Sequence, residues 1–372
     1  MNTELRKNPV LVIMRPTESC NLQCRYCYNA VSAPNTRMST ETLHNAIKSV
    51  LSHFRKVVFL WHGGECTLMG INFLRQALQI QKRYGTENHE IVNEIQTNGT
   101  LLNREWIDFF AGNKFYVGVS IDGPACLNDT ARLYEDGRGT YEDIFKNIIL
   151  LKESGIVLAG ICVLAKHNID HLSEVVDFYR EQGIPLNINP FVSSGRGKVF
   201  RKELTISPAQ YAETMIWLFD QWFADPSVKI YEFWKIVKSM FTGYNNICCY
   251  SGECSRDYLS ICPTGDVFPC GRWAETQSFC MGNVNIDSME QITQSRPVTQ
   301  ILKRQELIGQ CKNCLWFEIC HGGCPHTAYV YDGNINMPDY YCHGRKELFA
   351  HIYGVVKEEI DVCSSQNPSA QC

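Results

Sequence analysis

Cys20-Asn21-Leu22-Gln23-Cys24-Arg25-Tyr26-Cys27 is the stretch that most constrains the fold of this chain. It has the spacing C-x3-C-x2-C and directly follows an apolar run that begins at Val10. Three thiolates this close can reach one metal centre from a single loop. A four-iron, four-sulfur cube has four corner ligands, so three cysteines leave one iron open. A structural zinc site would need a fourth ligand, and no other Cys or His lies nearby in sequence. We therefore predict a catalytic iron–sulfur site at the C-terminal end of a parallel strand, where barrel active sites form.

Apolar runs and helical patterns alternate along the first half of the chain. The expected strands cover residues 10–13, 57–60, 91–95, 115–119, 157–163 and 184–188. The expected helices between and after them cover residues 40–54, 72–84, 104–110, 141–153 and 171–181. Continuous apolar strands that are each followed by a helix indicate a parallel sheet buried on both faces. Six such units are too few for a closed eight-stranded barrel, so we predict an α/β fold with a partial (β/α)6 barrel.

After this alternation the sequence pattern changes. A Ser/Gly-rich linker at 193–197 is followed by Trp- and Phe-rich helical stretches at 208–223 and 233–241. We expect four segments: a barrel core at 1–192, a linker with helices at 193–247, a Cys-rich domain at 248–342, and a C-terminal helix and tail at 343–372. The Cys-rich segment cannot build much apolar core, so inorganic clusters are expected to hold it together.

Composition excludes several classes of function. The chain has 372 residues, a net charge of −4 and 45% hydrophobic residues. No basic field calls for nucleic acid or an anionic membrane, and no apolar run of about 18 residues could span a bilayer. Met1 to Pro9 lack the features of a secretory signal, so we predict a cytoplasmic protein. In a reducing cytosol, metal ligation explains 19 cysteines better than disulfides do.

Eight cysteines in the second half form a pattern of their own. From Cys311 to Cys342 the spacing is C-x2-C-x5-C-x3-C-x17-C, and Cys270 ends a G-x4-C motif upstream. A zinc ribbon would pair two C-x2-C knuckles, and only one is present. Eight cysteines instead provide two complete sets for two further iron–sulfur cubes. Five of the remaining cysteines are expected to be bystanders: Cys66, Cys126, Cys162, Cys262 and Cys280.

The first motif, with Tyr26 just before its third cysteine, resembles the radical S-adenosylmethionine superfamily. The resemblance implies that the open iron chelates the methionine part of S-adenosyl-L-methionine, and that reduction then gives a 5′-deoxyadenosyl radical. It also implies cofactor contacts at the ends of the next strands. Tyr26 would pack by the adenine, and Arg132 would be the cationic partner of the carboxylate. The full set of implied contacts is Tyr26, Gly63, Gly64, Glu65, Asn98, Ser120, Asp122 and Arg132.

The second pattern is similar to the SPASM extension of peptide- and protein-modifying radical enzymes. That resemblance implies two auxiliary [4Fe-4S] clusters, and so three clusters in all. The first auxiliary cluster would be bound by Cys248, Cys254, Cys270 and Cys324, and the second by Cys311, Cys314, Cys320 and Cys342. Cys248 and Cys249 are adjacent, so this ligand is ambiguous; Cys248 is preferred because its gap to Cys254 fits the pattern better.

The general layout is similar to anaerobic sulfatase-maturing enzymes and to maturases of ribosomally made peptides. In the sulfatase-maturing enzymes an Asp directly follows the cysteine of the G-x4-C motif and serves as base; here that position is Gly271. Because glycine has no proton acceptor, we predict a cyclophane- or thioether-forming maturase of a precursor peptide. Formylglycine formation is the alternative, and another SPASM chemistry is a third. Asp266 is a candidate base, although Gly265-Asp266 is also typical of an ordinary turn.

The resemblance further implies a peptide or protein substrate and an electron donor such as flavodoxin or ferredoxin. Two other classes compete with it. A non-enzymatic electron carrier could hold three clusters but would not need an open iron, and a zinc-binding interaction protein would need its ligands in fours. A tRNA-modifying enzyme is not expected, because the chain is acidic and has no appended basic module.

Overall fold

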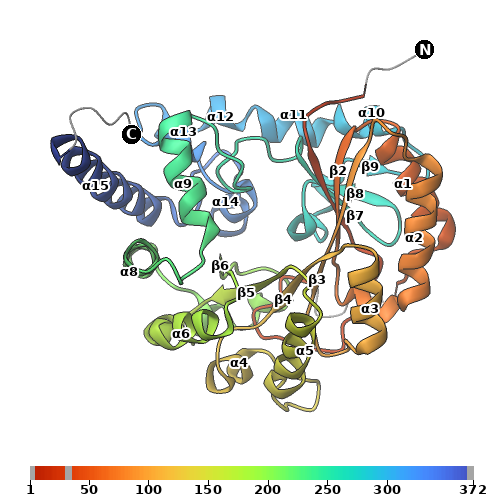
Figure 1. The fold of residues 1–372 in the computed structure, drawn as a ribbon. Helices are drawn as coiled ribbons and strands as arrows, with labels where there is room; N and C mark the ends of the chain where they lie inside the picture. The colour runs from red at the N-terminus through yellow and green to blue at the C-terminus, as the bar shows by residue number, and fades with distance from the viewer. Residues whose placement is uncertain (1–4, 30–35, 367–372) are drawn as a thin grey trace.

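The computed structural model describes residues 5–29 and 36–366 and contains one curved sheet flanked by helices (Figure 1). Its nine strands run in the order β6-β5-β4-β3-β2-β1-β7-β8-β9. The six predicted strands are all present and parallel to their neighbours. They are β1 (Val10–Met14), β2 (Lys56–Trp61), β3 (Glu90–Thr97), β4 (Tyr116–Ser120), β5 (Leu158–Leu164) and β6 (Leu186–Pro190). The predicted partial, open (β/α) barrel is confirmed.

Helices follow these strands and lie around the outer side of the sheet (Figure 1). They are α1 (Thr40–Leu51), α2 (Ile71–Tyr84), α3 (Arg104–Gly112), α4 (Ala125–Ala131), α5 (Tyr141–Glu153) and α6 (Leu172–Gln182). Local chemistry sets several of their ends: the side chain of Ser39 accepts a hydrogen bond from the Thr42 amide, and Asn103 accepts one from the Trp106 amide. Gly183 ends α6 in the left-handed conformation, at φ 66°. The short helix α4 was not expected from the sequence.

The sheet does not stop at the barrel. Strand β7 (Tyr258–Ile261) pairs parallel to the free edge of β1, and β8 (Asp266–Phe268) and β9 (Gly282–Asn283) continue antiparallel. These strands come from the Cys-rich part of the sequence, where no strand was expected. The segment therefore joins the barrel through main-chain hydrogen bonds, and Cys270 follows directly after β8.

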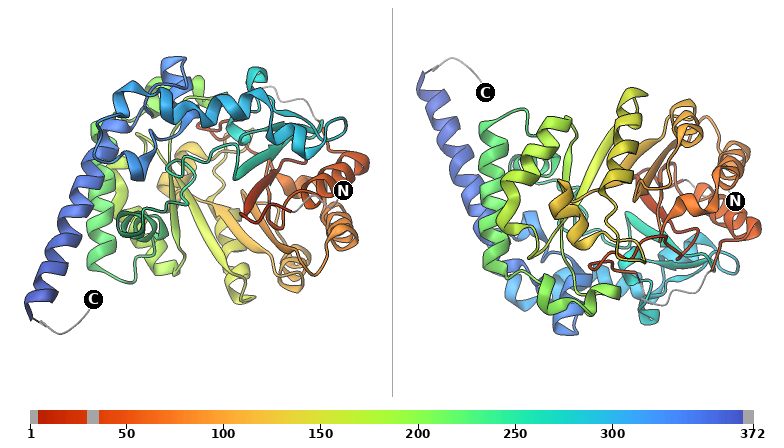
Figure 2. Two further views of the ribbon diagram at one scale, coloured as in Figure 1. Left: turned by 90° about the horizontal axis from the view of Figure 1, so that it is seen from above. Right: turned by 90° about the horizontal axis from the view of Figure 1, so that it is seen from below.

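The remaining elements lie at the β6 end and across the top of the sheet in Figure 1. After the linker come α7 (Arg201–Leu204), α8 (Pro208–Ala224) and α9 (Tyr231–Thr242). Five short helices follow β9: α10 (Met289–Thr293), α11 (Arg296–Leu302), α12 (Arg304–Leu307), α13 (Phe317–Cys320) and α14 (Pro325–Asp332). The last helix, α15 (Cys342–Gln366), packs along α8 and α9, as both views in Figure 2 show. No helix in the described ranges is long and apolar enough to cross a membrane.

Candidate active site

The three cysteines of the first motif line a cavity at the C-terminal ends of the parallel strands. It encloses about 930 Å³ of space, part of it open to solvent. Cys20, Cys24 and Cys27 share its wall with most of the predicted cofactor contacts, which are Tyr26, Gly63, Gly64, Asn98, Ser120 and Arg132. Side chains from loops more than 100 residues apart in sequence are therefore brought together as expected. Glu65 and Asp122 are not part of the wall and lie buried behind it.

Two glycines allow the loop after β2 to press against the cysteine loop. A Cβ atom on Gly63 would lie 2.4 Å from the Thr17 carbonyl oxygen, and one on Gly64 would lie 2.2 Å from the Ser19 carbonyl oxygen. Gly63 also has φ +113°, which other residues rarely adopt. The amide of Gly64 donates to the Thr17 oxygen at 2.9 Å. Only glycine fits here, so the loop presents backbone to the cavity.

Glu65 connects two strand ends from behind the cavity. Its Oε1 accepts from the hydroxyls of Thr67 and Thr97 at 2.7 and 2.8 Å, and its Oε2 accepts from the Asn98 amide at 2.7 Å. Burial raises the pKa of this carboxyl, and the hydrogen bonds oppose that shift. The Glu65 carboxylate already positions Asn98, so it would have two roles if it also made the expected contact with the methionine amino group.

Asp122 has a similar place behind β4. It accepts hydrogen bonds from Arg132 Nε at 3.1 Å, from the Val163 amide at 2.9 Å, and from the Tyr26 hydroxyl. The guanidinium of Arg132 also lies 5.2 Å from the centre of the Tyr26 ring. Asp122 is fully buried and so fixes the two side chains that do face the cavity.

The cysteine loop fits a group that binds thiolates. Burial raises the pKa of Cys24 to about 12 and also raises those of Cys20 and Cys27. Deprotonation at neutral pH then needs a cation, and a coordinating metal supplies it. In the part of the chain that the structure describes, no three His, Cys, Asp or Glu side chains converge on the point that a single ion would occupy. The thiols instead surround a larger space.

The first auxiliary set comes together from four segments. The charges of Cys270 and Cys324 act on Cys248, and those of Cys248, Cys270 and Cys324 act on Cys254; all of these interactions raise the thiol pKa. Burial is the larger cause in both cases. Cys249 lies in the field of Arg345 and Glu232, and more weakly in that of Cys248 and Cys324.

The second auxiliary set surrounds a smaller cavity. All four expected ligands line it, together with Arg345 and Lys346: Cys311, Cys314, Cys320 and Cys342. Trp316 and Phe349 close its apolar side. The four cysteines of this set thus line one cavity in the fold.

The cavity wall also contains residues that were not assigned a role from the sequence, among them Tyr28, His62 and Arg272. His62 lies within the Trp61–Glu65 segment, but a single histidine carries no pattern that indicates its role. Asp266 does not line this cavity. Its Oδ1 accepts from Asn283 and its Oδ2 from the Thr264 hydroxyl, at 2.8 and 2.7 Å, within the turn that begins β8.

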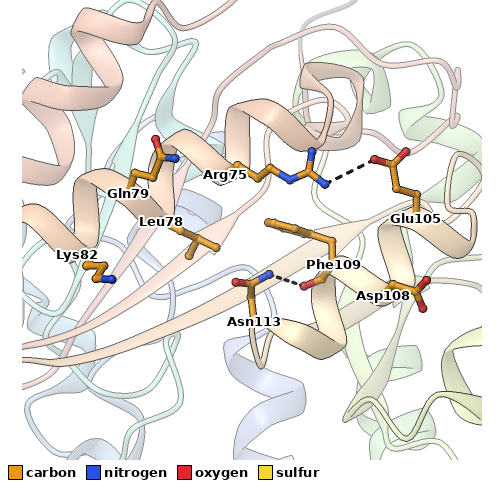
Figure 3. Close-up of a pocket in the computed structure, with 8 residues that line it drawn as sticks. All are labelled: Arg75, Leu78, Gln79, Lys82, Glu105, Asp108, Phe109 and Asn113. Carbon is orange, nitrogen blue, oxygen red and sulfur yellow. Dashed lines mark hydrogen bonds and ion pairs between the residues drawn. The ribbon is translucent and has the colours of Figure 1, made fainter.

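A second hollow lies far from these groups, between α2 and α3 (Figure 3). Arg75 forms an ion pair with Glu105 at 3.6 Å, and Asn113 donates to the Phe109 carbonyl at 2.8 Å. None of the predicted site residues is among those that line it. It is an open polar groove on the helix layer, so the candidate site is the cavity at the strand ends.

Two sequence families match this chain. The Radical SAM superfamily matches residues 14–179, which include the last residue of β1, the cysteine loop and strands β2 to β5. The SPASM iron–sulfur cluster-binding domain matches residues 248–315, from Cys248 to just past Cys314.

Curated relatives cover nearly the whole chain. A cysteine-type anaerobic sulfatase-maturating enzyme from Clostridium perfringens is 26% identical over 93% of this chain and 96% of its own length. A serine-type enzyme from Bacteroides thetaiotaomicron is 28% identical over 92% of this chain and 89% of its own.

Solved structures agree with these relatives. Native anSMEcpe with bound AdoMet and a Kp18Cys peptide superposes with a TM-score of 0.86 at 26% identity, covering 95% of this chain and 99% of that one. Streptococcus suis SuiB bound to its precursor peptide SuiA gives a TM-score of 0.68 at 17% identity, over 90% of this chain and 76% of that one. The second likeness concerns the fold alone.

Proposed function

Because the chain is a radical S-adenosylmethionine enzyme with a SPASM domain, we propose that it oxidises a cysteine or serine side chain of a peptide or protein to an aldehyde. The observation that carries this proposal is the full-length likeness to a peptide-bound sulfatase-maturing enzyme. Sequence analysis favoured a cross-linking maturase because of Gly271. The comparisons support its alternative, formylglycine formation, better.

The cofactors are S-adenosyl-L-methionine and [4Fe-4S] clusters. We assign the catalytic cluster to Cys20, Cys24 and Cys27, whose thiols line the main cavity. When bound there, the cofactor supplies an adenosyl radical that can abstract hydrogen. The backbone at Gly63 and Gly64 and the side chains of Asn98, Ser120 and Arg132 would bind it, while Glu65 and Asp122 position those groups from behind.

The two auxiliary clusters are assigned to the two cysteine sets, with Cys248 rather than Cys249 in the first. The mutual electrostatic interactions of Cys248, Cys254, Cys270 and Cys324 support that choice. Arg272 lines the cavity wall and also lies in the field of Cys324, Cys270 and Cys248. This position supports an electron-transfer route between the first auxiliary set and the main cavity. We further propose a small electron donor, such as flavodoxin or ferredoxin, and a cytoplasmic location.

The test is an anaerobic assay of the iron-loaded, reduced protein with S-adenosyl-L-methionine. Three peptides that differ at one position, Cys, Ser or Ala, serve as substrates, and the Ala peptide is the matched control. We expect a product that reacts with a hydrazide from the Cys or Ser peptide and none from the Ala peptide. Oxidation of serine and cross-linking both remove two hydrogen atoms, so mass alone does not separate them. Hydrazide-unreactive product whose fragments show two joined residues would refute the proposal in favour of the cross-linking reaction.

A further inference from the structure

The wall of the main cavity contains one histidine and, among its described residues, no carboxylate. Its arginines, Arg132 and Arg272, cannot accept a proton. The hydroxyls of Tyr26 and Tyr28 are phenols, which stay protonated at neutral pH. The three cysteines of the wall are assigned to the cluster. The imidazole of His62 is therefore the group of this wall that is suited to take up a proton.

His62 is held firmly beside the cysteine loop. Its amide donates to the Met14 carbonyl at 2.9 Å, which continues the β1–β2 pairing past the strand end. Its Nε2 lies 3.3 Å from the Tyr28 hydroxyl, and the two rings meet edge to face with centres 6.1 Å apart. Burial and the positive charge of Arg15 lower the pKa of His62 to about 4. The imidazole is thus neutral at physiological pH and is able to accept a proton.

Tyr28 also lies close to position 271. A Cβ atom there would lie 3.2 Å from the Tyr28 hydroxyl and 3.6 Å from Arg15 Nη1. The same Arg15 atom donates to the Gly271 carbonyl at 2.6 Å. Tyr28 therefore limits the room for a side chain at 271, and it lies between His62 and the loop that carries Cys270.

We propose that His62 is the proton acceptor of the reaction, with Tyr28 as its positioning residue. This inference rests on the proposed function. The side-chain carbon of the substrate loses one hydrogen atom to the adenosyl radical. The side chain would then lose one electron, for which an auxiliary iron–sulfur cluster would be the acceptor, and its S–H or O–H proton, which passes to the imidazole of His62. A C=S or C=O double bond remains, and water converts the thioaldehyde to the aldehyde with release of hydrogen sulfide.

A weak base is sufficient for this step. Loss of the electron leaves the S–H or O–H bond on a cationic centre, which makes its proton strongly acidic. A low pKa also lets His62 return the proton to solvent after each turnover. His62 is a weak base, but the oxidised side chain is a strong acid, so the proton transfer between them is favourable.

The experiment compares His62→Gln, Tyr28→Phe and wild type by the amount of aldehyde formed per 5′-deoxyadenosine. A substrate deuterated at the reacting carbon reports hydrogen abstraction separately, through deuterium in the deoxyadenosine. His44→Gln is the matched control, because His44 and Tyr84 form the same edge-to-face pair, with Nε2 2.8 Å from the hydroxyl, on the helices α1 and α2. Iron content and visible absorbance check that each variant keeps its clusters.

For His62→Gln we expect normal iron content, deuterium transfer within about twofold of wild type, and at least about tenfold less aldehyde per deoxyadenosine. Added imidazole should restore part of the aldehyde yield in His62→Ala, which a purely structural role would not allow. Tyr28→Phe should show a smaller fall, and His44→Gln none.

An unchanged ratio in His62→Gln would overturn the inference, as would equal losses of deuterium transfer and product. Failure of the proposed function looks different, because wild type itself would then give no aldehyde. If wild type forms another oxidised peptide, the yield of that product per deoxyadenosine decides the role of His62 in the same way.

Discussion

The chain holds its predicted clusters in two regions that differ in how they are stabilised. The cysteine loop at Cys20–Cys27 lies on a barrel whose core is continuous and apolar, with residues such as Val12, Phe59 and Trp61 fully buried. The Cys-rich segment adds residues such as Ile261 and Ile292 to that core, but it also has a small separate cluster around Trp273 and helices of four to eight residues. Isolated helices shorter than about 12 residues are marginal in water. We therefore expect the first region to fold without its cluster and the second to depend more on ligation.

The largest expected effect is a loss of activity without a loss of fold. Cys24→Ala should abolish cleavage of S-adenosyl-L-methionine, because one of the three ligands on the loop is gone. The melting temperature should stay close to that of wild type, since the barrel core is intact. Deoxyadenosine by chromatography and unfolding by circular dichroism measure the two effects. Cleavage at the wild-type rate in this variant, or in Cys20→Ala or Cys27→Ala, would contradict the assignment.

The second region should respond in the opposite way. Cys320→Ala or Cys342→Ala should lower soluble yield, iron content and melting temperature together, because cluster ligation supplies folding free energy. Cys262→Ala is the matched control, since Cys262 is 6% exposed against 9% for Cys320 and belongs to neither set. Iron content and melting temperature equal to wild type in the Cys320 variant would show that ligation does not support this segment.

Arg304 tests how far the second region depends on polar groups instead of an apolar core. Its buried guanidinium donates to backbone carbonyls of the loops around Gly322 and Ile335, including Gly323 at 2.9 Å and Met337 at 2.9 Å. Arg304→Met leaves these carbonyls without a donor and should cost about 3 kcal/mol in the free energy of unfolding. Arg256→Met, which removes a single ion pair between the exposed Arg256 and the partly exposed Glu253, should cost less than Arg304→Met, at about 1 kcal/mol. If both substitutions lowered the free energy of unfolding by the same amount, Arg304 would have no special role in stabilising this region.

Glu232 on α9 gives a pH-dependent comparison. Burial raises its pKa from 4.5 to about 7, while Arg345 and Lys235 oppose the shift. The folded protein therefore binds the proton more tightly than the unfolded chain, and stability falls as pH rises from about 4.5 through 7. Glu232→Gln should stabilise the protein by about 2 kcal/mol at pH 8 and by little at pH 5. Denaturant unfolding at both pH values measures this, with the exposed Glu213→Gln as control. A gain of equal size at both pH values would refute the pH argument.

The smallest effect is expected at Asp266. Its carboxylate oxygens are both used in the turn before β8, and it does not line the main cavity. Asp266→Asn should lower product formation less than tenfold, which is under about 1.4 kcal/mol of barrier. A larger loss of product formation at normal iron content would support Asp266 as the base.

The barrel could be predicted because its signals are local. The helix expected at 141–153 is α5, Tyr141–Glu153, and the strand expected at 10–13 is β1, Val10–Met14. Apolar periodicity and capping residues suffice for such elements. The short strands β7 to β9 were missed, because their few residues show no periodicity and their pairing depends on a partner far away in sequence.

The site divides in the same way. The resemblance of the motifs to known families was enough to group the cysteines and glycines that line the two cavities. It could not show that Glu65 and Asp122 have most of their oxygens occupied by neighbouring donors, or that Tyr28 lies close to Gly271. Those facts depend on distances between loops. The role proposed for His62 depends on them too, so no pattern around Trp61 could indicate it.

The pairing of β1 with β7 has a consequence for synthesis on the ribosome. Leu11 pairs with Tyr258, so about 250 residues must be made before the outer edge of β1 finds its partner. At about 5 to 20 residues per second, that edge stays open for many seconds after the strand itself has emerged. An unpaired edge strand can template aggregation, and such a distant contact slows folding. A truncation after β6 would keep every parallel strand of the barrel and still leave this edge open, so it should yield aggregates in place of a usable minimal enzyme.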